Sequence, residues 1–324
     1  MKWLLALICS IVLLPTVAFA QAKGELKVAL ILPGAITDGT FSSAADKGIK
    51  AAQKKFPQIK VSVRENTSFA ESEEALLSYA REGYDVVIGH GFQFGEPAMK
   101  IHKQFPKTWF VIDTVKVAEA PNLASFDNRW GDAGYIAGAV AASVSKTGII
   151  GHIGGIPVPV IQEYNEGFER GAKRINPKTK MLSAYVGSFS DIAKGKEITI
   201  SLIEQGADVV TATGNESVIG TLEAAKEKKV LMIATAFDSA PLAPDTIVTA
   251  ALVNFDVNLE MAIGKIIDGT LEPKNYLLGL NENGIGLAPY RKFDSKISAE
   301  NKAKIQQIMD DIRAGKVSDL PAIR

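Results

Sequence analysis

Short, almost purely apolar segments alternate with amphipathic segments along most of this 324-residue chain. Residues 26–32 (LKVALIL), 84–89 (YDVVIG) and 108–113 (TWFVID) are typical of buried strands, and segments with helical spacing lie between them. Strands that are apolar on both faces and alternate with helices form parallel sheets that helices cover on both sides. The chain is therefore predicted to be an α/β protein.

The alternation starts anew after residue 127, so the chain has two halves of similar pattern. The spacing predicts strands at residues 26–32, 59–64, 84–89, 108–113, 123–126, 148–153, 181–185, 208–213, 230–234 and 246–253. It predicts helices at residues 44–55, 72–82, 96–104, 132–146, 161–175, 193–205, 217–228, 257–268 and 298–314. Two such halves suggest two doubly wound domains, although the pattern alone does not exclude one large sheet or a tandem enzyme.

The first twenty residues (MKWLLALICSIVLLPTVAFA) combine a positive charge at Lys2, an apolar run and a terminal small-x-small sequence. This order is typical of a cleavable signal peptide, so we predict a signal peptide at residues 1–20 and a mature chain that begins at Gln21. A lipoprotein signal at Cys9 is the alternative, but a large residue directly precedes that cysteine. We therefore expect a soluble periplasmic protein without a lipid anchor.

Charge and composition exclude several classes of protein. The 36 Lys and Arg residues balance 36 Asp and Glu residues, whereas a non-specific nucleic-acid binder needs a basic surface. The single cysteine excludes a disulfide framework and any cysteine-based zinc site, and the three histidines show no metal-ligand spacing. No GxSxG, Walker A or GxGxxG motif is present. We expect no metal, cofactor, nucleic-acid partner or catalytic residue.

Glycine, aromatic and polar residues gather directly after the predicted strands. These segments are residues 33–41 (PGAITDGTF), 89–92 (GHGF), 154–157 (GGIP), 213–216 (TGNE) and 237–239 (FDS). In open parallel sheets, ligands bind beyond the carboxyl ends of the strands. Glycines let the backbone approach a ligand, while Phe, Asp and Asn side chains provide stacking and hydrogen bonds. The mixture favours a flat small molecule with polar edges.

The order of these segments, together with others along the chain, resembles a known family. The matching segments are 38–41 (DGTF), 89–92 (GHGF), 134–138 (GYIAG), 154–161 (GGIPVPVI), 167–168 (GF), 185–191 (YVGSFSD), 194–197 (KGKE), 205–208 (QGAD) and 284–289 (GIGLAP). Through them the chain resembles the basic membrane protein (BMP) family of ABC-transporter substrate-binding proteins, and within it the PnrA-like branch, which binds purine nucleosides. The resemblance extends over essentially the whole mature chain.

The resemblance implies a type I periplasmic-binding-protein fold, with two doubly wound parallel-sheet lobes joined by a three-crossing hinge. The implied N-terminal lobe comprises residues 25–127 plus 252–285, and the C-terminal lobe comprises residues 128–251 plus 286–324. The crossings are expected after residue 127, near residues 248–253 and near residues 284–289. The ligand would lie between the lobes and stabilise their closed arrangement.

Roles in the first lobe follow from the same resemblance. Phe41 is expected to stack on one face of the ligand, and Asp38 is expected to contact the edge of the base. Gly91 and Phe92 are expected to bring backbone and ring to the cleft. Chemistry alone leaves other roles open, because Asp38 can cap a helix and both phenylalanines can belong to the core.

The second lobe departs from the nucleoside-binding branch. Asp238 resembles the acid that accepts ribose hydroxyls, with stabilisation of a turn as its alternative. Gly214 and Asn215 stand where the branch has a Gly-Gly-Thr-Gly-like loop, and the branch's sugar-binding lysine is missing near Asn254. No second aromatic residue is found by motif, so Trp130 is its candidate, with hinge packing as the alternative. A nucleobase such as adenine therefore fits nearly as well as a purine nucleoside.

The implied function is to bind a purine-type ligand and deliver it to an ABC permease in the inner membrane, as a monomer. Three alternatives stay open. The same fold can bind another flat heterocycle such as riboflavin, or it can act as a ligand sensor. An exported nucleoside hydrolase is the third, although it would need an Asp-rich calcium cluster near the amino terminus, and the sequence has none.

Overall fold

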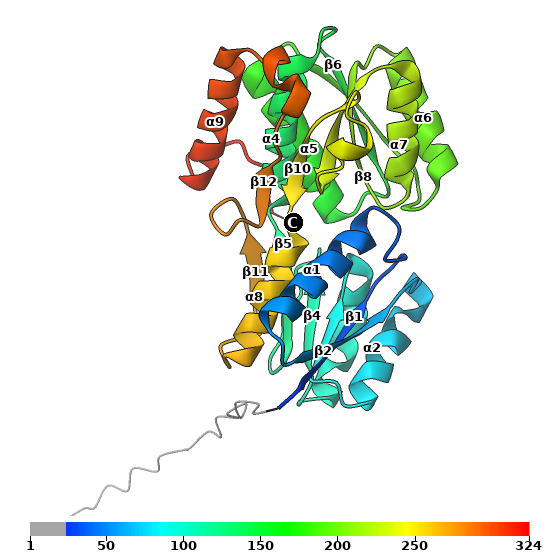
Figure 1. Ribbon diagram of the computed structural model, residues 1–324, viewed down its shortest axis with the longest axis vertical. Helices are drawn as coiled ribbons and strands as arrows, with labels where there is room; N and C mark the ends of the chain where they lie inside the picture. The colour runs from blue at the N-terminus through cyan, green and yellow to red at the C-terminus, as the bar shows by residue number, and fades with distance from the viewer. Residues whose placement is uncertain (1–23, 324) are drawn as a thin grey trace, which may run out of the picture.

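Two α/β lobes make up the computed structural model, which describes residues 24–323 (Figure 1). Each lobe contains a six-stranded sheet. The predicted signal peptide at residues 1–20 lies outside the described residues. None of the helices between residues 24 and 323 has the length and apolar character that a membrane span needs.

The sheet of the N-terminal lobe has the strand order β11-β5-β4-β3-β1-β2, and all neighbouring strands in it are parallel. Its strands are β1 (Leu26–Ile31), β2 (Ile59–Arg64), β3 (Val86–Gly89), β4 (Trp109–Asp113), β5 (Leu123–Asn128) and β11 (Asn275–Leu278). The strands β3, β4 and β5 are buried along their whole length. Burial on both faces explains why β3 and most of β4 are continuous apolar runs in the sequence, whereas β5 also buries Ser125, Asp127 and Asn128.

Helices cover both faces of this sheet. They are α1 (Phe41–Lys55), α2 (Ser72–Arg81), α3 (Gly95–Ile101) and α8 (Phe255–Ile267). Figure 1 shows α1 beside α8, and these two helices share a hydrophobic cluster with one face of the sheet. The helices α2 and α3 share a second cluster with the other face. The lobe is therefore doubly wound, as predicted.

The sheet of the C-terminal lobe has the strand order β12-β10-β9-β8-β6-β7. Its strands are β6 (Ile149–Gly154), β7 (Lys180–Tyr185), β8 (Val209–Thr213), β9 (Leu231–Ala236), β10 (Ile247–Val253) and β12 (Ile285–Leu287). All pairs are parallel except β10 with β12, which is antiparallel. This sheet is therefore mixed rather than purely parallel.

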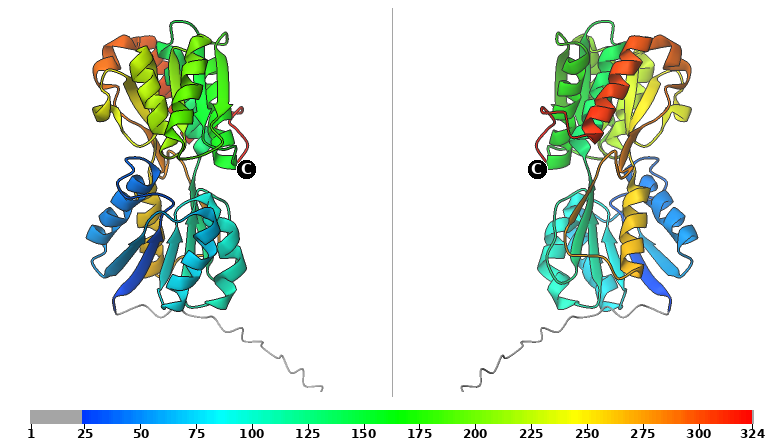
Figure 2. Two further views of the ribbon diagram at one scale, coloured as in Figure 1. Left: turned by 90° about the vertical axis from the view of Figure 1, so that its right-hand side faces the viewer. Right: turned by 90° about the vertical axis from the view of Figure 1, so that its left-hand side faces the viewer.

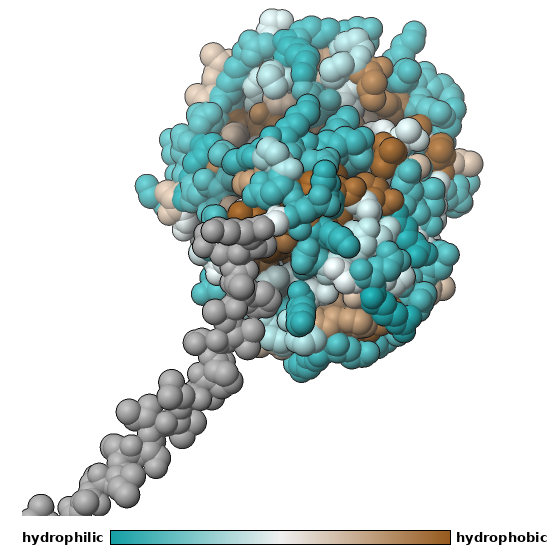
Figure 3. Space-filling model, turned by 60° about the horizontal axis from the view of Figure 1, so that its bottom comes forward, coloured by the Kyte–Doolittle hydropathy of each residue, from teal (hydrophilic) through white to brown (hydrophobic). Residues whose placement is uncertain are grey.

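The helices of the C-terminal lobe are α4 (Trp130–Val144), α5 (Pro159–Ile175), α6 (Ile192–Glu204), α7 (Ser217–Lys228) and α9 (Ala299–Arg313). The helices α4, α5 and α9 share the cluster on one face, and α6 and α7 lie over the cluster on the other. Each face of each sheet thus has its own hydrophobic cluster. The visible surface is largely hydrophilic, with smaller hydrophobic areas (Figure 3).

Three segments join the lobes, between β5 and α4, between β10 and α8, and between β11 and β12 (Figure 2). The Asn128 side chain donates to the carbonyl of Gly284 (2.7 Å), and the backbone N–H of Asn254 donates to the same carbonyl (2.8 Å). The backbone N–H of Arg129 donates to the carbonyl of Leu278 (2.9 Å). The three crossings are thus hydrogen-bonded to one another and form one hinge.

The strands and helices predicted from the spacing are all present, with ends that differ by up to three residues. The spacing does not predict two short edge strands, β11 and β12. They have four and three residues, too few for a recognisable period, and they form because each pairs with a strand far away in the sequence.

Candidate ligand-binding site

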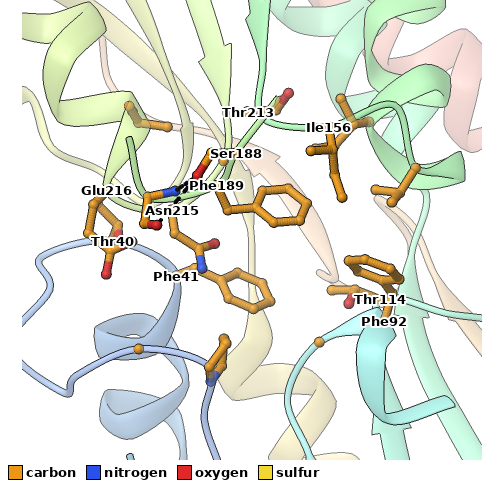
Figure 4. A pocket seen from close by; sticks show the side chains of 18 of the residues that line it. Thr40, Phe41, Phe92, Thr114, Ile156, Ser188, Phe189, Thr213, Asn215 and Glu216 are labelled. Atoms are coloured by element: carbon orange, nitrogen blue, oxygen red, sulfur yellow. Dashed lines mark hydrogen bonds between the residues drawn. The ribbon is translucent and has the colours of Figure 1, made fainter. Parts of the chain in front are cut away.

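A cavity of about 610 Å³ lies between the lobes (Figure 4). In the N-terminal lobe its lining comes from the loops after β1, β2, β3 and β4. In the C-terminal lobe it comes from the loops after β6, β7, β8 and β9. All these loops follow the carboxyl ends of parallel strands, where open α/β sheets bind ligands. The volume is in the range of small-molecule sites.

Aromatic rings from both lobes line the cavity. They are Phe41, Phe69 and Phe92 from the N-terminal lobe, Phe189 and Phe237 from the C-terminal lobe, and Trp130 from the first crossing. The rings of Phe41, Phe92 and Phe189 face the same space in Figure 4. The ring centroids of Phe92 and Phe189 lie 6.0 Å apart across the lobes. Phe189 is an aromatic residue of the second lobe that the sequence analysis did not single out, although it lies in the matching segment 185–191 directly after a predicted strand.

The ring of Phe41 stacks on the ring of a buried histidine. The ring of His90 stacks on that of Phe41 with centroids 3.7 Å apart and an interplanar angle of 20°. His90 Nε2 lies 3.1 Å from the carbonyl oxygen of Phe41, and Nδ1 contacts the Asp113 carboxylate. Phe255 meets both rings edge-on. The orientation of the Phe41 ring is therefore fixed before any ligand binds.

Asp38 is not among the residues that line the cavity. Its carboxylate accepts hydrogen bonds from the backbone N–H groups of Thr40 (2.7 Å), Ser42 (2.9 Å) and Ser43 (3.0 Å), at the start of α1. These contacts are those of a helix cap, the alternative that its chemistry left open. By fixing the first turn of α1, Asp38 positions Phe41, the first residue of that helix.

Gly91 and Phe92 both line the cavity. Gly91 has a φ of 128°, which side chains rarely permit, and its N–H donates to the Asp113 carboxylate (2.8 Å). The same carboxylate contacts His90, so Asp113 fixes the positions of Phe41 and Phe92 together. Phe69 packs against Phe92 with ring centroids 5.3 Å apart and is 56% exposed, which places it at the rim.

Gly214 and Asn215 also line the cavity, in the loop after β8. The backbone N–H groups of Asn215 (3.2 Å) and Ser217 (3.0 Å) donate to the carbonyl of Phe189. An added Cβ on Gly214 would lie 2.5 Å from Ser217 Oγ, so a side chain at this position would force the Ser217 hydroxyl to move. This loop therefore holds the Phe189 segment in place.

Trp130 lines the cavity at the first crossing and is buried. Its Nε1–H donates to the Asp127 carboxylate (3.0 Å), which also accepts from the backbone N–H of Asn128 (2.8 Å). Burial raises the pKa of Asp127 to about 7, and the nearby Glu163 and Asp113 carboxylates add to the rise. The Trp130 indole is thus hydrogen-bonded within the first crossing and also lines the cavity.

The free energy of unfolding is expected to depend less on pH in the Asp127→Asn variant than in the wild type. The pKa of Asp127 rises from 3.8 in the unfolded chain to about 7 in the folded protein, so stability falls as pH increases through this window. Asparagine retains an acceptor for the Trp130 indole. When the pH is raised from 5 to 8, the free energy of unfolding of the wild type should fall by on the order of 2 kcal/mol more than that of the variant. Urea unfolding at the two pH values measures this difference. Parallel profiles of the two proteins would contradict this account.

Asp238 lies outside the cavity lining, next to Phe237, which belongs to it. Its carboxylate forms an ion pair with Arg291 and accepts from the backbone N–H of Ala240 (3.3 Å). These contacts are those of a turn-stabilising aspartate, the alternative noted for this residue. Asp238 therefore fixes the turn that carries Phe237.

Buried polar groups support the C-terminal half of the cavity. His152 Nε2 lies 2.9 Å from the hydroxyl of Thr213, and burial lowers the pKa of His152 to about 3, so its ring is neutral near pH 7. The hydroxyl of Thr235 donates to Tyr164 Oη (3.0 Å). The lining hydroxyls of Thr213 and Thr235 thus have partners within the protein. Among residues 24–323, His, Cys, Asp and Glu side chains form no group suited to a metal ion.

Comparison of the sequence with known families finds a match over most of the chain. Residues 25–318 match the Bmp family, described as ABC transporter substrate-binding protein PnrA-like. A purine-binding protein of Brucella abortus is 27% identical over 89% of this chain and 83% of the relative. Basic membrane protein D of Borreliella burgdorferi is 29% identical over 86% of this chain and 83% of the relative.

Solved structures share the fold. An ABC transporter solute-binding protein from Conexibacter woesei has a TM-score of 0.71 and 24% identity over 90% of this chain and 97% of its own. A transcriptional activator of the comK gene from Bacillus halodurans has a TM-score of 0.77 and 25% identity over 90% and 99% of the two chains. These neighbours confirm the type I periplasmic-binding-protein fold predicted from the sequence.

The family match fixes the kind of protein. It confirms a non-catalytic, extracytoplasmic binding protein that takes up a small solute between two lobes and works with an ABC transporter. The described cavity, built from strand-end loops of both lobes, lies where open α/β sheets bind ligands. The chain therefore belongs to the Bmp family of PnrA-like ABC transporter substrate-binding proteins.

Proposed function

We propose that this protein binds a purine-type ligand, either a nucleobase such as adenine or a purine nucleoside, and delivers it to an ABC permease of the inner membrane. The observation that carries the proposal is the set of aromatic rings that both lobes place around one cavity. Phe41 and Phe92 offer faces from one lobe, and Phe189 and Phe237 offer faces from the other. A planar heterocycle stacks favourably between such rings.

Two further observations support a neutral purine. The lining contains no Lys or Arg among residues 24–323, so a nucleotide phosphate would have no cation to neutralise it. The similar protein of Brucella abortus is named as purine-binding. At 27% identity that name supports the chemical class, and the aromatic cavity of this chain gives the class a physical basis.

Hinge closure is the expected transport cycle. The moving bodies that we propose are residues 25–127 with 252–285 and residues 128–251 with 286–324. A ligand that contacts both lobes binds the closed arrangement more tightly and increases its population. One contact between the lobes is an ion pair of Lys116 Nζ with Glu163 Oε1 (3.0 Å). The mature protein is proposed to be a soluble periplasmic monomer that begins at Gln21.

Thermal unfolding in the presence of candidate ligands tests the proposal. Protein freed of bound ligand by unfolding and refolding is mixed with adenine, adenosine, inosine or riboflavin. A purine at one hundred times its Kd should stabilise the protein by about 2.7 kcal/mol and raise its Tm. A rise with riboflavin and none with any purine would overturn the purine assignment. Release of free base from inosine would instead indicate a hydrolase.

A sensory role is the second candidate, favoured by one structural neighbour. The Bacillus halodurans protein with a TM-score of 0.77 is described as a transcriptional activator. Uptake of radiolabelled purine by vesicles that contain the permease distinguishes the two roles. Uptake that depends on added binding protein supports delivery, and binding without any such uptake supports sensing.

A further inference from the structure

Left-handed backbone conformations gather at the cavity. Six residues other than glycine between 24 and 323 have a positive φ, and three of them line the cavity: Asn66 (54°), Thr114 (56°) and Ala236 (71°). This conformation is uncommon for any side chain, and a β-branched side chain such as that of threonine disfavours it most. Residues of this kind persist where the surrounding structure fixes them, and they are concentrated at ligand-binding sites. Thr114, directly after β4, is therefore the most strained residue of the three.

The residues next to Thr114 are anchored on both sides. Before it, the Asp113 carboxylate accepts from the backbone N–H of Gly91 (2.8 Å). After it, Lys116 Nζ forms an ion pair with Glu163 of the other lobe (3.0 Å). The backbone at Thr114 is therefore held between two fixed points, and a relaxed conformation would disturb these contacts.

The hydroxyl of Thr114 is open to the cavity. The residue is 6% exposed and belongs to the lining. Its Oγ1 has no hydrogen-bond partner among residues 24–323, and it is not one of the unpaired hydroxyls that are closed to solvent, which belong to Thr40, Thr67 and Thr179. Since the rest of the residue is buried, the open side of Oγ1 is the side that faces the cavity.

The other threonines of the lining differ from Thr114. The hydroxyls of Thr213 and Thr235 have partners within the protein, and those of Thr40 and Thr67 are closed off from the cavity. Thr114 thus has the one threonine hydroxyl in the described lining that is both unpaired and accessible. A hydroxyl without a partner in a largely apolar site gains a hydrogen bond when a ligand supplies one.

The charged side chain of the lining lies at the other end. Glu216 is the single ionisable residue in the lining as the structure describes it, and its Oε1 would lie 3.2 Å from an added Cβ on Gly34. Figure 4 shows Glu216 and Thr114 on opposite sides of the Phe41 ring. A carboxylate can only accept, whereas a hydroxyl can also donate. The two ends of the site therefore suit different atoms of a ligand.

We propose that Thr114 is a specificity-determining residue of the cavity, whose hydroxyl donates a hydrogen bond to a ring nitrogen of the purine on the edge that points away from Glu216. The left-handed backbone of Thr114 holds the hydroxyl toward the ligand. The inference rests on the proposed purine function and names a residue that recognises the base. Because nucleobases and nucleosides both carry ring nitrogens, both kinds of ligand should depend on this hydroxyl.

The Thr114→Val variant tests the contact, because valine has nearly the shape of threonine and lacks the hydroxyl. The Kd for adenine and the Kd for adenosine should both rise about threefold or more, by the same factor. Thr114→Ser keeps the hydroxyl and should retain a Kd within about twofold of the wild type. Thr179→Val, outside the lining, is the matched control and should leave both Kd values unchanged. Isothermal titration calorimetry measures the binding, and circular dichroism shows that each variant is folded.

The outcomes separate this contact from the function on which it rests. An unchanged Kd for adenine in folded Thr114→Val would overturn the contact, and so would a loss confined to adenosine, since the hydroxyl would then touch the sugar. Thr114→Gly also lacks the hydroxyl and permits the positive φ, so it replaces the valine variant if that protein does not fold. A wild-type protein that binds neither probe would instead overturn the purine function.

Discussion

The Gly171→Ala variant is expected to lose about 3 kcal/mol of the free energy of unfolding, through a single added methyl group. A Cβ on Gly171, in α5, would lie 1.8 Å from the carbonyl oxygen of Tyr135 in α4. The obstacle is backbone, which cannot rotate away as a side chain can. Both helices belong to the buried core of the C-terminal lobe, so they could separate only by disturbing that core. Urea unfolding measures the loss.

The contact between these helices is close along its whole length. An added Cβ on Gly134, Gly138 or Gly167 would also lie within 2.1 Å of a backbone atom of the facing helix. Gly264→Ala in α8 is the control, because its nearest neighbour would be a ring atom of Phe56 at 3.4 Å. Alanine favours helix over glycine, so this variant should gain about 0.5–1 kcal/mol. Equal effects of the two substitutions would refute the close-packing argument.

The Phe41→Ala variant is expected to weaken purine binding by about 1–3 kcal/mol, the usual contribution of an aromatic side chain that stacks on a base. One face of the Phe41 ring is occupied by His90, and the residue also lines the cavity. The ring is therefore a platform whose orientation needs no further ordering when the ligand arrives. Isothermal titration calorimetry with adenine measures the change.

A matched control separates stacking from stability. Phe56→Ala removes a phenylalanine at the far end of α1, outside the cavity lining, and should leave the Kd unchanged. Phe189→Ala should resemble Phe41→Ala, because Phe189 lines the cavity from the other lobe. An unaltered Kd for Phe41→Ala, in a protein that still folds, would remove Phe41 from the binding site.

Much of the fold could be predicted because its signals are local. The apolar runs of β3 and β4 follow from burial on both faces, and the helix α7 has the bounds that its spacing predicts. The position of the cavity also follows from the sequence pattern. In a parallel sheet the carboxyl ends of all strands lie at one edge, so the loops that follow them must meet.

The roles of the acidic residues could not be predicted, because several roles require the same side chain. Asp38 caps α1 through neighbours within five residues, and this local contact competed with a role in base recognition. Asp238 pairs with Arg291, which is 53 residues further along the chain. No local sequence pattern distinguishes an aspartate that binds a ligand from one that already has a hydrogen-bond or ion-pair partner within the protein.

The sequence by itself determined the α/β class, the repeat of the pattern in a second half of the chain and the strand-end loops that form the cavity, since periodicity and glycine content are properties of neighbouring residues. Only the tertiary structure decided which groups meet: His90 beneath Phe41, Phe189 opposite Phe92, and Glu216 beside Gly34. These pairs come from different strand ends, and the last two come from different lobes. Their contacts depend on strand order and hinge geometry, which arise from packing over the whole molecule and leave no trace in any short segment.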